Sequence, residues 1–455
     1  MDGNTIMNFG ENCIIRFLKM NDTLLKGKFY AKLKGIIFFL SLAVIYSSCE
    51  KRQDKYSTQL NKDPLNEILD RYVNDGIYPF LYSRIEDSSG RVVYEHSVVN
   101  RKLLPDVSIN ANTWIRIWSM SKLVTISLAM DLIEENTISL KDPVSNYIPE
   151  FKDLKVAVNS DRISLARLQS KDNPCPFNLV DADSVLKIKN LFDHTAGFYY
   201  ALTGFGCIDS LFANVDAPNQ KDGDELIKSL AQLPLIQHPG EIYRYGMNTT
   251  VLGLLLERAT GQSLNDLVLN RITNLHNING LRYTLPENVN LIPGFTGRDG
   301  DLRKVRDGEL DLYGENVPDY HPETNLFLGG EGMLATAKGY INFMRLLFFS
   351  SSIKSKEFLS EESIKEMTSK PKGEQNDDGY NTGYAFYLTS ETHSYEKNIL
   401  RVGGYEKTGC WVDRKNQLIG TLFTQANETA DKIGLGSKMQ NDFKQELYRQ
   451  LSNYE

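Results

Sequence analysis

The sequence predicts an α+β protein in which an antiparallel sheet flanked by helices is built from both ends of the chain, with a mainly helical region inserted between them. Two β-rich runs, "YPFLYSRIED" and "GRVVYEHSVV", lie near the start of the chain, and three further strand-like runs lie within residues 398–425. The stretch from residue 119 to about 350 is mostly helical in pattern. Strands at both ends around a helical middle favour one sheet that the two ends share.

Composition allows a large folded core and argues against several classes of function. Hydrophobic residues make up 41% of the 455 residues and charged residues 24%, which is ordinary for a globular protein. The net charge of −7 is mild and Lys and Arg are scattered, so no nucleic-acid partner is expected. The cysteines form no Cys-x-x-Cys pair and no Cys/His cluster, so we expect no metal and no cofactor, and a disulfide framework is not needed at this size. The five cysteines are Cys13, Cys49, Cys175, Cys207 and Cys410.

Residues 1–49 predict an export signal of the lipoprotein type. Residues 26–34 are basic, and the apolar run 35–46 is too short to span a bilayer as a helix of about 20 residues. Cys49 follows two serines and resembles the lipidated cysteine of bacterial lipoproteins, with Met20 as a candidate true start. We therefore expect an exported protein, periplasmic or associated with the outer membrane, held at the membrane by a lipid on Cys49. A plain cleaved signal, with Cys49 incidental, is the alternative.

One folded domain is expected after this signal. Residues 50–62 are polar and unpatterned, as a linker would be. The domain then covers residues 63–455. Its sheet part is expected at about 63–115 and 330–455, and its helical part at about 116–329.

The local patterns assign elements in chain order. Apolar residues at helical spacing predict a helix over 64–76, and Ser88, Ser89 and Gly90 separate the two β-rich runs as a hairpin turn does. Residues 155–184 and 285–325 are rich in Asn, Asp, Gly and Pro and are expected to be loops. Residues 428–451 return to a helical pattern at the end of the chain.

The pair Ser119 and Lys122, in "SMSKLVTISLAMDLIEEN", is the strongest candidate for catalysis. Its Ser-x-x-Lys spacing is weak evidence by itself, but only this copy opens a long and almost wholly apolar helix. The other copies are Ser48/Lys51, Ser184/Lys187, Ser351/Lys354, Ser369/Lys372 and Ser394/Lys397.

Burial of this helix would bring the two side chains together. Residues three apart share one helical face, so Lys122 would lie in the first turn beside the Ser119 hydroxyl. A buried amine must be paired or lose its proton, and loss of the proton would let Lys122 exchange protons with a serine nucleophile. The alternative is that Ser119 only caps the helix and Lys122 extends to solvent.

Further segments in a fixed order resemble the serine β-lactamase family in its class C branch, which includes β-lactamase-like carboxylesterases and D-amino-acid peptidases. The resemblance covers residues 65–447 and implies a β-lactamase/transpeptidase-like fold. Ser-x-x-K is a known motif of this group. The segments are "SMSK" at 119–122, "DPVSNYIPEF" at 142–151, "LKIKNLFDHTAGF" at 186–198, "PGEIYRYGMNTTVLGLLLERATG" at 239–261, "GGEGMLATAKGYINFMRLL" at 329–347 and "GGYEKTGCWVDRKNQLIGTLFTQ" at 403–425.

The resemblance implies roles for three residues. Ser119 would be the acylated nucleophile and Lys122 its proton-transfer partner. Tyr245, in "YGMN", matches the tyrosine that helps to deprotonate the serine and to protonate the leaving group. The asparagine of the same motif falls on Met247, with Asn248 one residue late, so the amide that contacts a β-lactam side chain is missing.

The third motif of the family is expected at Val402-Gly403-Gly404, and not at the literal Lys-Thr-Gly of 407–409. Counting back from "CWVDR" puts 407–409 in a hairpin turn, where glycine is favoured. Val402 has neither charge nor hydroxyl, so the usual anchor for a substrate carboxylate is absent. Gly403 and Gly404 would let a substrate approach the strand closely.

The oxyanion hole is expected from the backbone N–H groups of Ser119 and Tyr405. His194 is expected to be scaffold, since the histidines have no visible Asp and Ser partners and no G-x-S-x-G occurs. Residues proposed to line the pocket are Trp118, Tyr199, Tyr200, Met247, Asn248 and Val402.

The predicted reaction is hydrolysis through an acyl-enzyme on Ser119. The substrate would be a small-molecule ester or amide, as for a carboxylesterase or amidase, and a β-lactam-like compound is a further candidate. Two alternatives stay open: a β-lactamase or D-Ala-type peptidase, and a non-catalytic binding lipoprotein of the envelope. The presence of Ser119, Lys122 and Tyr245 together argues against the last.

Overall fold

The computed structural model describes one folded unit within residues 61–455. The predicted signal, including Cys49, and linker residues 50–59 lie outside the described residues, so export and lipidation stay predictions. None of the helices that the structure describes has the length and apolarity needed to cross a membrane. The described residues are 60–169, 172, 174–298, 300–306, 309, 320–350, 357–369, 380–389, 398–433 and 436–452.

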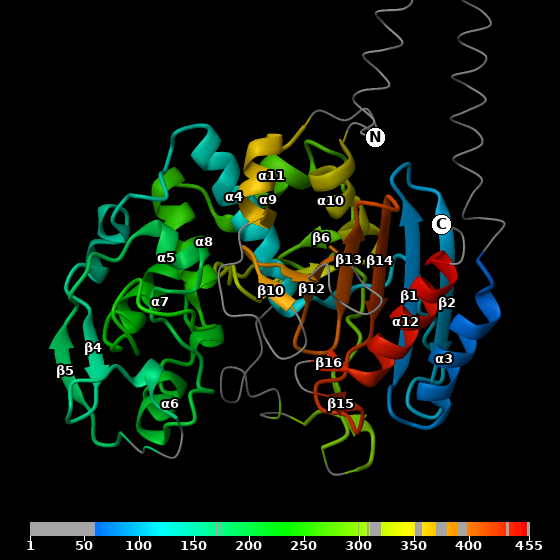
Figure 1. Ribbon diagram of the computed structural model, residues 1–455, viewed down its shortest axis with the longest axis horizontal. Coiled ribbons are helices and arrows are strands. Elements are labelled where there is room, and N and C mark those ends of the chain that lie inside the picture. The colour runs from blue at the N-terminus through cyan, green and yellow to red at the C-terminus, as the bar shows by residue number, and fades with distance from the viewer. Residues whose placement is uncertain are drawn as a thin grey trace, which may run out of the picture. The chain divides into compact units, whose positions relative to one another are not determined.

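A seven-stranded antiparallel sheet forms the centre of the unit, with the strand order β10-β11-β12-β13-β14-β1-β2 (Figure 1). β1 pairs with β14 from Tyr82 opposite Phe423 to Asp87 opposite Leu418, so the strands of this sheet that come first and last in the chain lie side by side. The predicted sheet shared by the two chain ends is confirmed. The strands are β1 Phe80–Asp87, β2 Val92–Val99, β10 Tyr380–Thr382, β11 Tyr387–Thr389, β12 Leu400–Gly403, β13 Gly409–Asp413 and β14 Leu418–Phe423.

Helices cover both faces of this sheet. On one face α12 (Lys438–Ser452) lies beside α3 (Lys62–Asn74), and Phe443 of α12 packs against Trp411 of β13 (Figure 1). The neighbouring Cys410 points to the other face, because successive strand residues alternate. There it lies near Tyr340 of α10 (Ala337–Phe349), and α10 packs against β13 and β14. β14 is therefore buried along its whole length.

The inserted helical region lies between β2 and α10 in the chain (Figure 1). Its central helix α4 is buried on almost every residue and packs against α8, which explains its apolar sequence. The predicted helix after Ser119 is present, but it begins at Ser121 and follows a 3₁₀ turn at Trp118–Met120. The helices of this region are α4 Ser121–Glu134, α5 Ile188–Phe192, α6 Gly206–Ala213, α7 Gly223–Leu230, α8 Asn248–Thr260 and α9 Leu264–Val268.

Three sequence predictions are wrong in detail. Within the predicted loop 285–325, residues Phe295–Thr296 and Arg303–Lys304 pair as antiparallel strands. Within the predicted loop 155–184, residues Lys155–Val158 (β4) and Asn178–Asp181 (β5) pair as a hairpin, and a disulfide joins Cys175 to Cys207 of α6. At the chain end α12 starts ten residues later than expected because the β15–β16 hairpin precedes it. The remaining short elements are α11 Glu361–Ser369, β3 Ile115–Arg116, β6 Leu281–Arg282, β7 Phe295–Thr296, β8 Arg303–Lys304, β9 Leu334–Ala335, β15 Lys432–Ile433 and β16 Gly436–Ser437.

Candidate active site

Ser119 lies on the short 3₁₀ turn that leads into α4. Trp118, immediately before it, has a left-handed backbone with φ of 47°, a conformation that costs a bulky residue free energy and persists only when the surroundings hold it. The N-cap of α4 is Met120, and the Ser119 side chain instead contacts Tyr245 and Lys122. The alternative in which Ser119 serves only as a helix cap is therefore wrong.

The structure brings Ser119, Lys122 and Tyr245 together. Tyr245 Oη lies 2.6 Å from Ser119 Oγ, and Lys122 Nζ lies 3.4 Å from the same oxygen. Lys122 Nζ also lies 4.9 Å from the centroid of the Tyr245 ring. Lys122 is only 2% exposed, so it does not reach solvent, whereas Tyr245 is 41% exposed. A substrate can therefore meet the hydroxyl groups from solvent, with the amine behind them.

Behind Lys122 lies a buried carboxylate that the sequence reading did not single out. Glu331 is 0% exposed, and its Oε2 is 3.6 Å from Lys122 Nζ. It accepts hydrogen bonds from Tyr200 Oη at 2.9 Å and from Thr250 Oγ1 at 2.8 Å. Burial raises the pKa of Glu331, and the nearby Lys122 ammonium opposes that rise. The available signal was one acidic residue inside the small-residue run "GGEGM".

The His194 ring packs against the Tyr245 ring. The two rings stack with centroids 5.0 Å apart and planes at 24°, and His194 Nδ1 lies 2.9 Å from the side-chain nitrogen of Asn248. Burial, with a smaller effect from Lys122, lowers the pKa of His194 to about 3, so it stays neutral at neutral pH. Met247 and Asn248 were predicted to line the pocket, but both are completely buried, with Asn248 bonded to His194.

The end of β12, with Gly403 and the following Gly404, lies against the turn that carries Ser119. A Cβ on Gly404 would lie 2.4 Å from the carbonyl oxygen of Ile117, so only glycine allows this approach. The next residue, Tyr405, packs its ring edge-on against Trp118 at 5.6 Å. Gly403 is exposed, while Val402 is buried on β12 opposite Cys410 of β13.

The literal Lys-Thr-Gly run lies at the hairpin turn between β12 and β13. Lys407 has φ of 63°, and its N–H donates to the carbonyl of Gly404 at 3.1 Å. Gly404 N–H in turn donates to the carbonyl of Thr408 at 2.9 Å. Gly409 is the first residue of β13. Lys407 and Thr408 therefore lie in the turn after β12, and the strand beside Ser119 ends at Gly403 instead.

A second buried carboxylate, Glu406, joins the turn between β12 and β13 to the segment before Ser119. Glu406 is 0% exposed and accepts from Arg116 Nε at 2.8 Å, from Arg116 Nη2 at 3.1 Å and from Trp118 Nε1 at 2.7 Å. Trp118, predicted as a pocket residue, is wholly buried in this arrangement. Tyr199 and Tyr200 are also buried, and Tyr200 Oη is 3.1 Å from Lys122 Nζ. We name Arg116, Trp118 and Glu406 the clamp.

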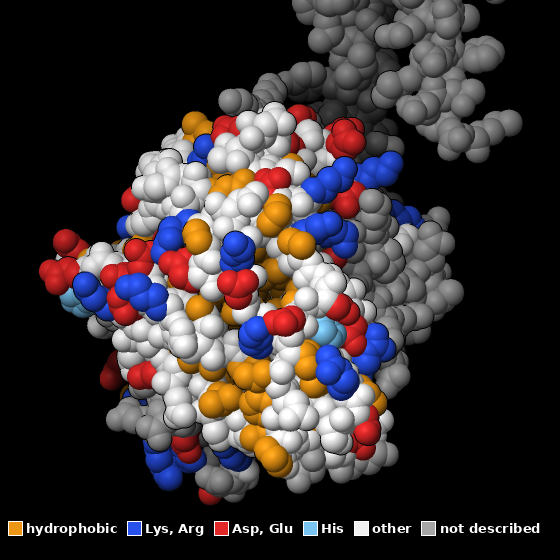
Figure 2. Space-filling model, turned by 90° about the vertical axis from the view of Figure 1, so that its left-hand side faces the viewer, with side chains coloured by type: hydrophobic (Ala, Val, Ile, Leu, Met, Phe, Trp, Pro, Cys, Tyr) orange, Lys and Arg blue, Asp and Glu red, His pale blue; other side chains and the backbone are white. Residues whose placement is uncertain are grey.

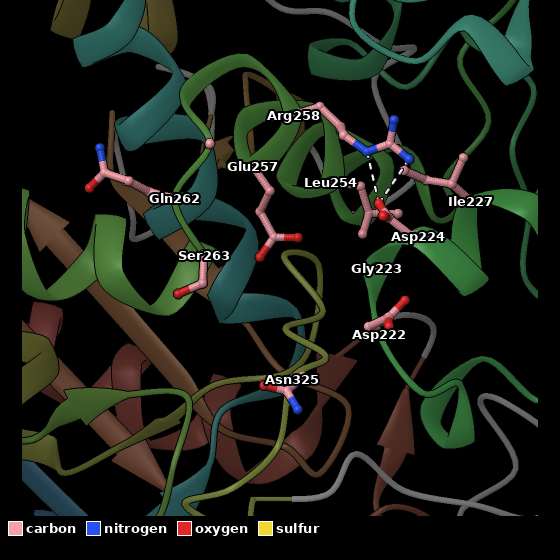
Figure 3. Close-up of a pocket in the computed structure, with 11 residues that line it drawn as sticks. Asp222, Gly223, Asp224, Ile227, Leu254, Glu257, Arg258, Gln262, Ser263 and Asn325 are labelled. Atoms are coloured by element: carbon pink, nitrogen blue, oxygen red, sulfur yellow. Dashed lines mark hydrogen bonds and ion pairs between the residues drawn. The ribbon is translucent and has the colours of Figure 1, made fainter.

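A separate cavity of about 360 Å³ lies between α7, α8 and the loop after α8 (Figure 3). Burial raises the pKa of Glu257, which lines this cavity, to about 7. Ser119, Lys122 and Tyr245 do not line it. Figure 2 shows positive and negative side chains scattered together over one described face, with hydrophobic side chains gathered near its centre.

Comparison with known proteins gives a consistent group of relatives. A family model described as Beta-lactamase matches residues 88–436. Protein Rv1367c of Mycobacterium tuberculosis is 25% identical over 312 residues, covering 68% of this chain and 70% of that protein. Lovastatin esterase of Penicillium rubens is 23% identical over 398 residues, covering 80% and 93%. The solved structure of EstCE1, described as a hydrolase with promiscuous acyltransferase activity, superposes with a TM-score of 0.68 at 19% identity, covering 85% of this chain and 97% of that chain.

Proposed function

The chain belongs to the beta-lactamase family, and we propose that within this family it is a serine hydrolase that works through an acyl-enzyme on Ser119. Its fold is β-lactamase/transpeptidase-like, as the resemblance implied. Relatives named as esterases support a hydrolase, and the identity of the nucleophile is our proposal.

The observation that carries this proposal is the 2.6 Å contact between Tyr245 Oη and Ser119 Oγ beside the buried amine of Lys122. Ser119 passes its proton to Tyr245 Oη while Oγ attacks the carbonyl carbon of the substrate. Tyr245 then gives this proton to the leaving alcohol or amine as its bond to the acyl carbon breaks. In the second half-reaction water attacks the ester on Ser119 and gives a proton to Tyr245, which returns it to Ser119 Oγ as the bond to the acyl carbon breaks and the acid leaves.

We assign the oxyanion hole to the backbone N–H groups of Ser119 and Tyr405. The close contact between Gly404 and Ile117 supports this assignment, because it holds the turn after β12 against the segment before the nucleophile. One such donor stabilises the transition state by about 2.7–4 kcal/mol in other enzymes.

The favoured substrate is a small carboxylic ester, with an amide as the harder case. Val402 provides no charge or hydroxyl for a substrate carboxylate, and Met247 replaces the asparagine that would contact a β-lactam side chain. Both substitutions weaken binding of penicillins and D-Ala peptides while leaving the acyl-transfer groups in position. Two relatives are named as esterases, Lovastatin esterase and Esterase EstB, and their names support an ester as the substrate.

The test is a turnover panel with wild type and Ser119→Ala. We expect wild type to hydrolyse p-nitrophenyl acetate, and to turn over penicillin G and a D-Ala-D-Ala peptide much more slowly or not at all. Ser119→Ala should lose ester hydrolysis while it unfolds at the same temperature. Ester turnover that survives in Ser119→Ala contradicts the assignment, and faster turnover of penicillin than of the ester favours the β-lactamase alternative.

We also propose that the protein is exported and anchored by a lipid on Cys49. The basic segment 26–34, the short apolar run 35–46 and the two serines before Cys49 support this location. Labelled palmitate should be incorporated into wild type in cells and not into Cys49→Ala. If wild type incorporates no palmitate, the lipid anchor is excluded and the alternative of a plain cleaved signal holds.

A further inference from the structure

We propose that Glu331 is a positioning residue whose carboxylate keeps Lys122 a cation, directed at Ser119 and Tyr245. The inference rests on the proposed function and adds to it a division of roles, in which Tyr245 takes the serine proton and Lys122 supplies positive charge.

Burial makes a counter-charge necessary. The side chains of Lys122 and Glu331 are 3% and 0% exposed, so neither charge is stabilised by bulk water. An uncompensated buried charge is strongly destabilising, whereas a paired and hydrogen-bonded one persists. Within the described part of the chain, Glu331 is the carboxylate that forms an ion pair with Lys122, at 3.6 Å.

The carboxylate is held in one orientation. Thr250 donates to Glu331 Oε1 and Tyr200 donates to Oε2, which occupies both oxygens. Gly330, the preceding residue, accepts a hydrogen bond from Lys122 Nζ at 2.8 Å through its carbonyl. A Cβ on Gly330 would lie 2.6 Å from Thr250 Oγ1 and 3.2 Å from Lys122 Nζ. Two adjacent residues therefore provide a carboxylate 3.6 Å and a carbonyl oxygen 2.8 Å from the amine nitrogen.

This arrangement directs the rest of the ammonium toward the reacting groups. Lys122 Nζ lies 3.4 Å from Ser119 Oγ and over the ring of Tyr245. A cation there stabilises the negative charge that passes between the tyrosine and serine oxygens. A neutral amine would instead compete with Tyr245 for the serine proton.

The groups that face this pair come from several elements. Lys122 lies on α4, Tyr200 on the loop after α5, and Tyr245 before α8. Tyr283, just after β6, interacts electrostatically with Glu331, and the neutral His194 stacks on the Tyr245 ring. Glu331 is the acidic member of this set, so its replacement changes the net charge around Lys122 directly.

A purely structural role for Glu331 makes a different prediction. Glu331→Gln keeps the shape and an acceptor oxygen but removes the charge. If the charge holds Lys122 protonated, kcat falls about 100-fold or more, and the alkaline limb of the kcat/KM profile moves down by about one pH unit or more, because the ammonium is no longer favoured. If only packing matters, the whole profile scales and its limbs stay in place.

The experiment measures kcat/KM for p-nitrophenyl acetate from pH 5 to 10 with wild type, Glu331→Gln, Glu331→Asp and Thr250→Val. Glu331→Asp keeps the charge one methylene farther away, so its alkaline limb should move less in the same direction. Thr250→Val removes one hydrogen bond to the carboxylate but keeps the acid, so its limb should also move down, by less than in Glu331→Gln. If Glu331→Gln does not fold, an unmoved limb in Glu331→Asp overturns the inference. A rise in activity at neutral pH, with the acid limb moving down, would also overturn it, because Lys122 would then act as a neutral base.

A thermal double-mutant cycle tests the ion pair without any turnover. Glu331→Gln and Lys122→Met should each lower Tm by more than the double variant does, since each single change leaves a buried group without its partner. Losses that add would overturn the pairing. Wild type that shows no ester turnover but retains this non-additivity would contradict the proposed function alone.

Discussion

Glu406→Gln tests whether the clamp positions the nucleophile. Glu406 lies after the proposed oxyanion residue Tyr405, and Trp118 lies before Ser119. The change keeps one acceptor oxygen and removes the negative charge that three N–H groups share, two from Arg116 and one from Trp118. It leaves the guanidinium of Arg116, 8% exposed, without a counter-charge.

The size of the effect follows from this burial. Breaking a buried ion pair by removing one partner costs about 3–5 kcal/mol. In a folded unit of roughly 400 residues, that loss lowers Tm by about 4–6 °C. The left-handed backbone of Trp118 costs about 1–3 kcal/mol and loses one of its supports, so the turn that aims Ser119 relaxes. A displacement of about 1 Å at a nucleophile lowers kcat about 100-fold.

Thermal unfolding and ester hydrolysis measure these two losses. The matched control is Arg116→Met with Glu406→Leu, which removes both charges and should be less destabilised than Glu406→Gln alone. We expect that double variant to recover Tm without recovering kcat, since Trp118 still lacks its acceptor. A Glu406→Gln protein with wild-type Tm and wild-type kcat would refute the reasoning.

Four further outcomes are expected. Tyr245→Phe lowers kcat by about 10²–10⁴-fold, and calorimetry should show little change in Tm because the side chain is 41% exposed; a loss under tenfold would contradict its role. Burial holds the pKa of Glu257 near 7 in the folded state, above its ordinary 4.5, so its ionisation costs the folded state about 3 kcal/mol above pH 7 and nothing at pH 4. Glu257→Gln should therefore raise Tm at pH 8 and not at pH 4, and equal shifts at both would exclude this cause. Removing the disulfide with Cys175→Ala and Cys207→Ala should lower the free energy of unfolding by about 3–4 kcal/mol, given the 32-residue separation, and urea titration measures it; an unchanged midpoint would show that the crosslink contributes nothing. Lys407→Ala should keep ester turnover within about twofold, since Lys407 lies in the turn; a folded but inactive variant would show that the literal Lys-Thr-Gly is functional.

Five of the seven strands of the sheet could be predicted because their signals are local, whereas the three-residue strands β10 and β11 were missed. The hairpin turn at residues 88–90 and the three strand runs after residue 398 can each be recognised within a few residues. The β4–β5 hairpin was missed because each strand has only four residues and the segment between them is rich in polar residues. The late start of α12 was missed because a helical pattern does not mark its first residue without a clear cap.

The residues of the candidate site that belong to family motifs could be predicted from the sequence. The buried carboxylates that pair with distant cations could not. Ser119, Lys122 and Tyr245 were found through the order of the motifs. Glu331 and Glu406 meet their partners across 209 and 290 residues, and nothing local in the sequence links an acidic residue to a particular distant cation. Such pairing depends on how the sheet and the helical region pack.

The most direct measurement of the central claim is peptide-mapped mass spectrometry after reaction with a fluorophosphonate. We expect one adduct on wild type, located on Ser119 in the peptide that also contains Lys122, and no adduct on Ser119→Ala. An adduct on another residue, or labelling that persists in Ser119→Ala, would contradict the acyl-enzyme on Ser119.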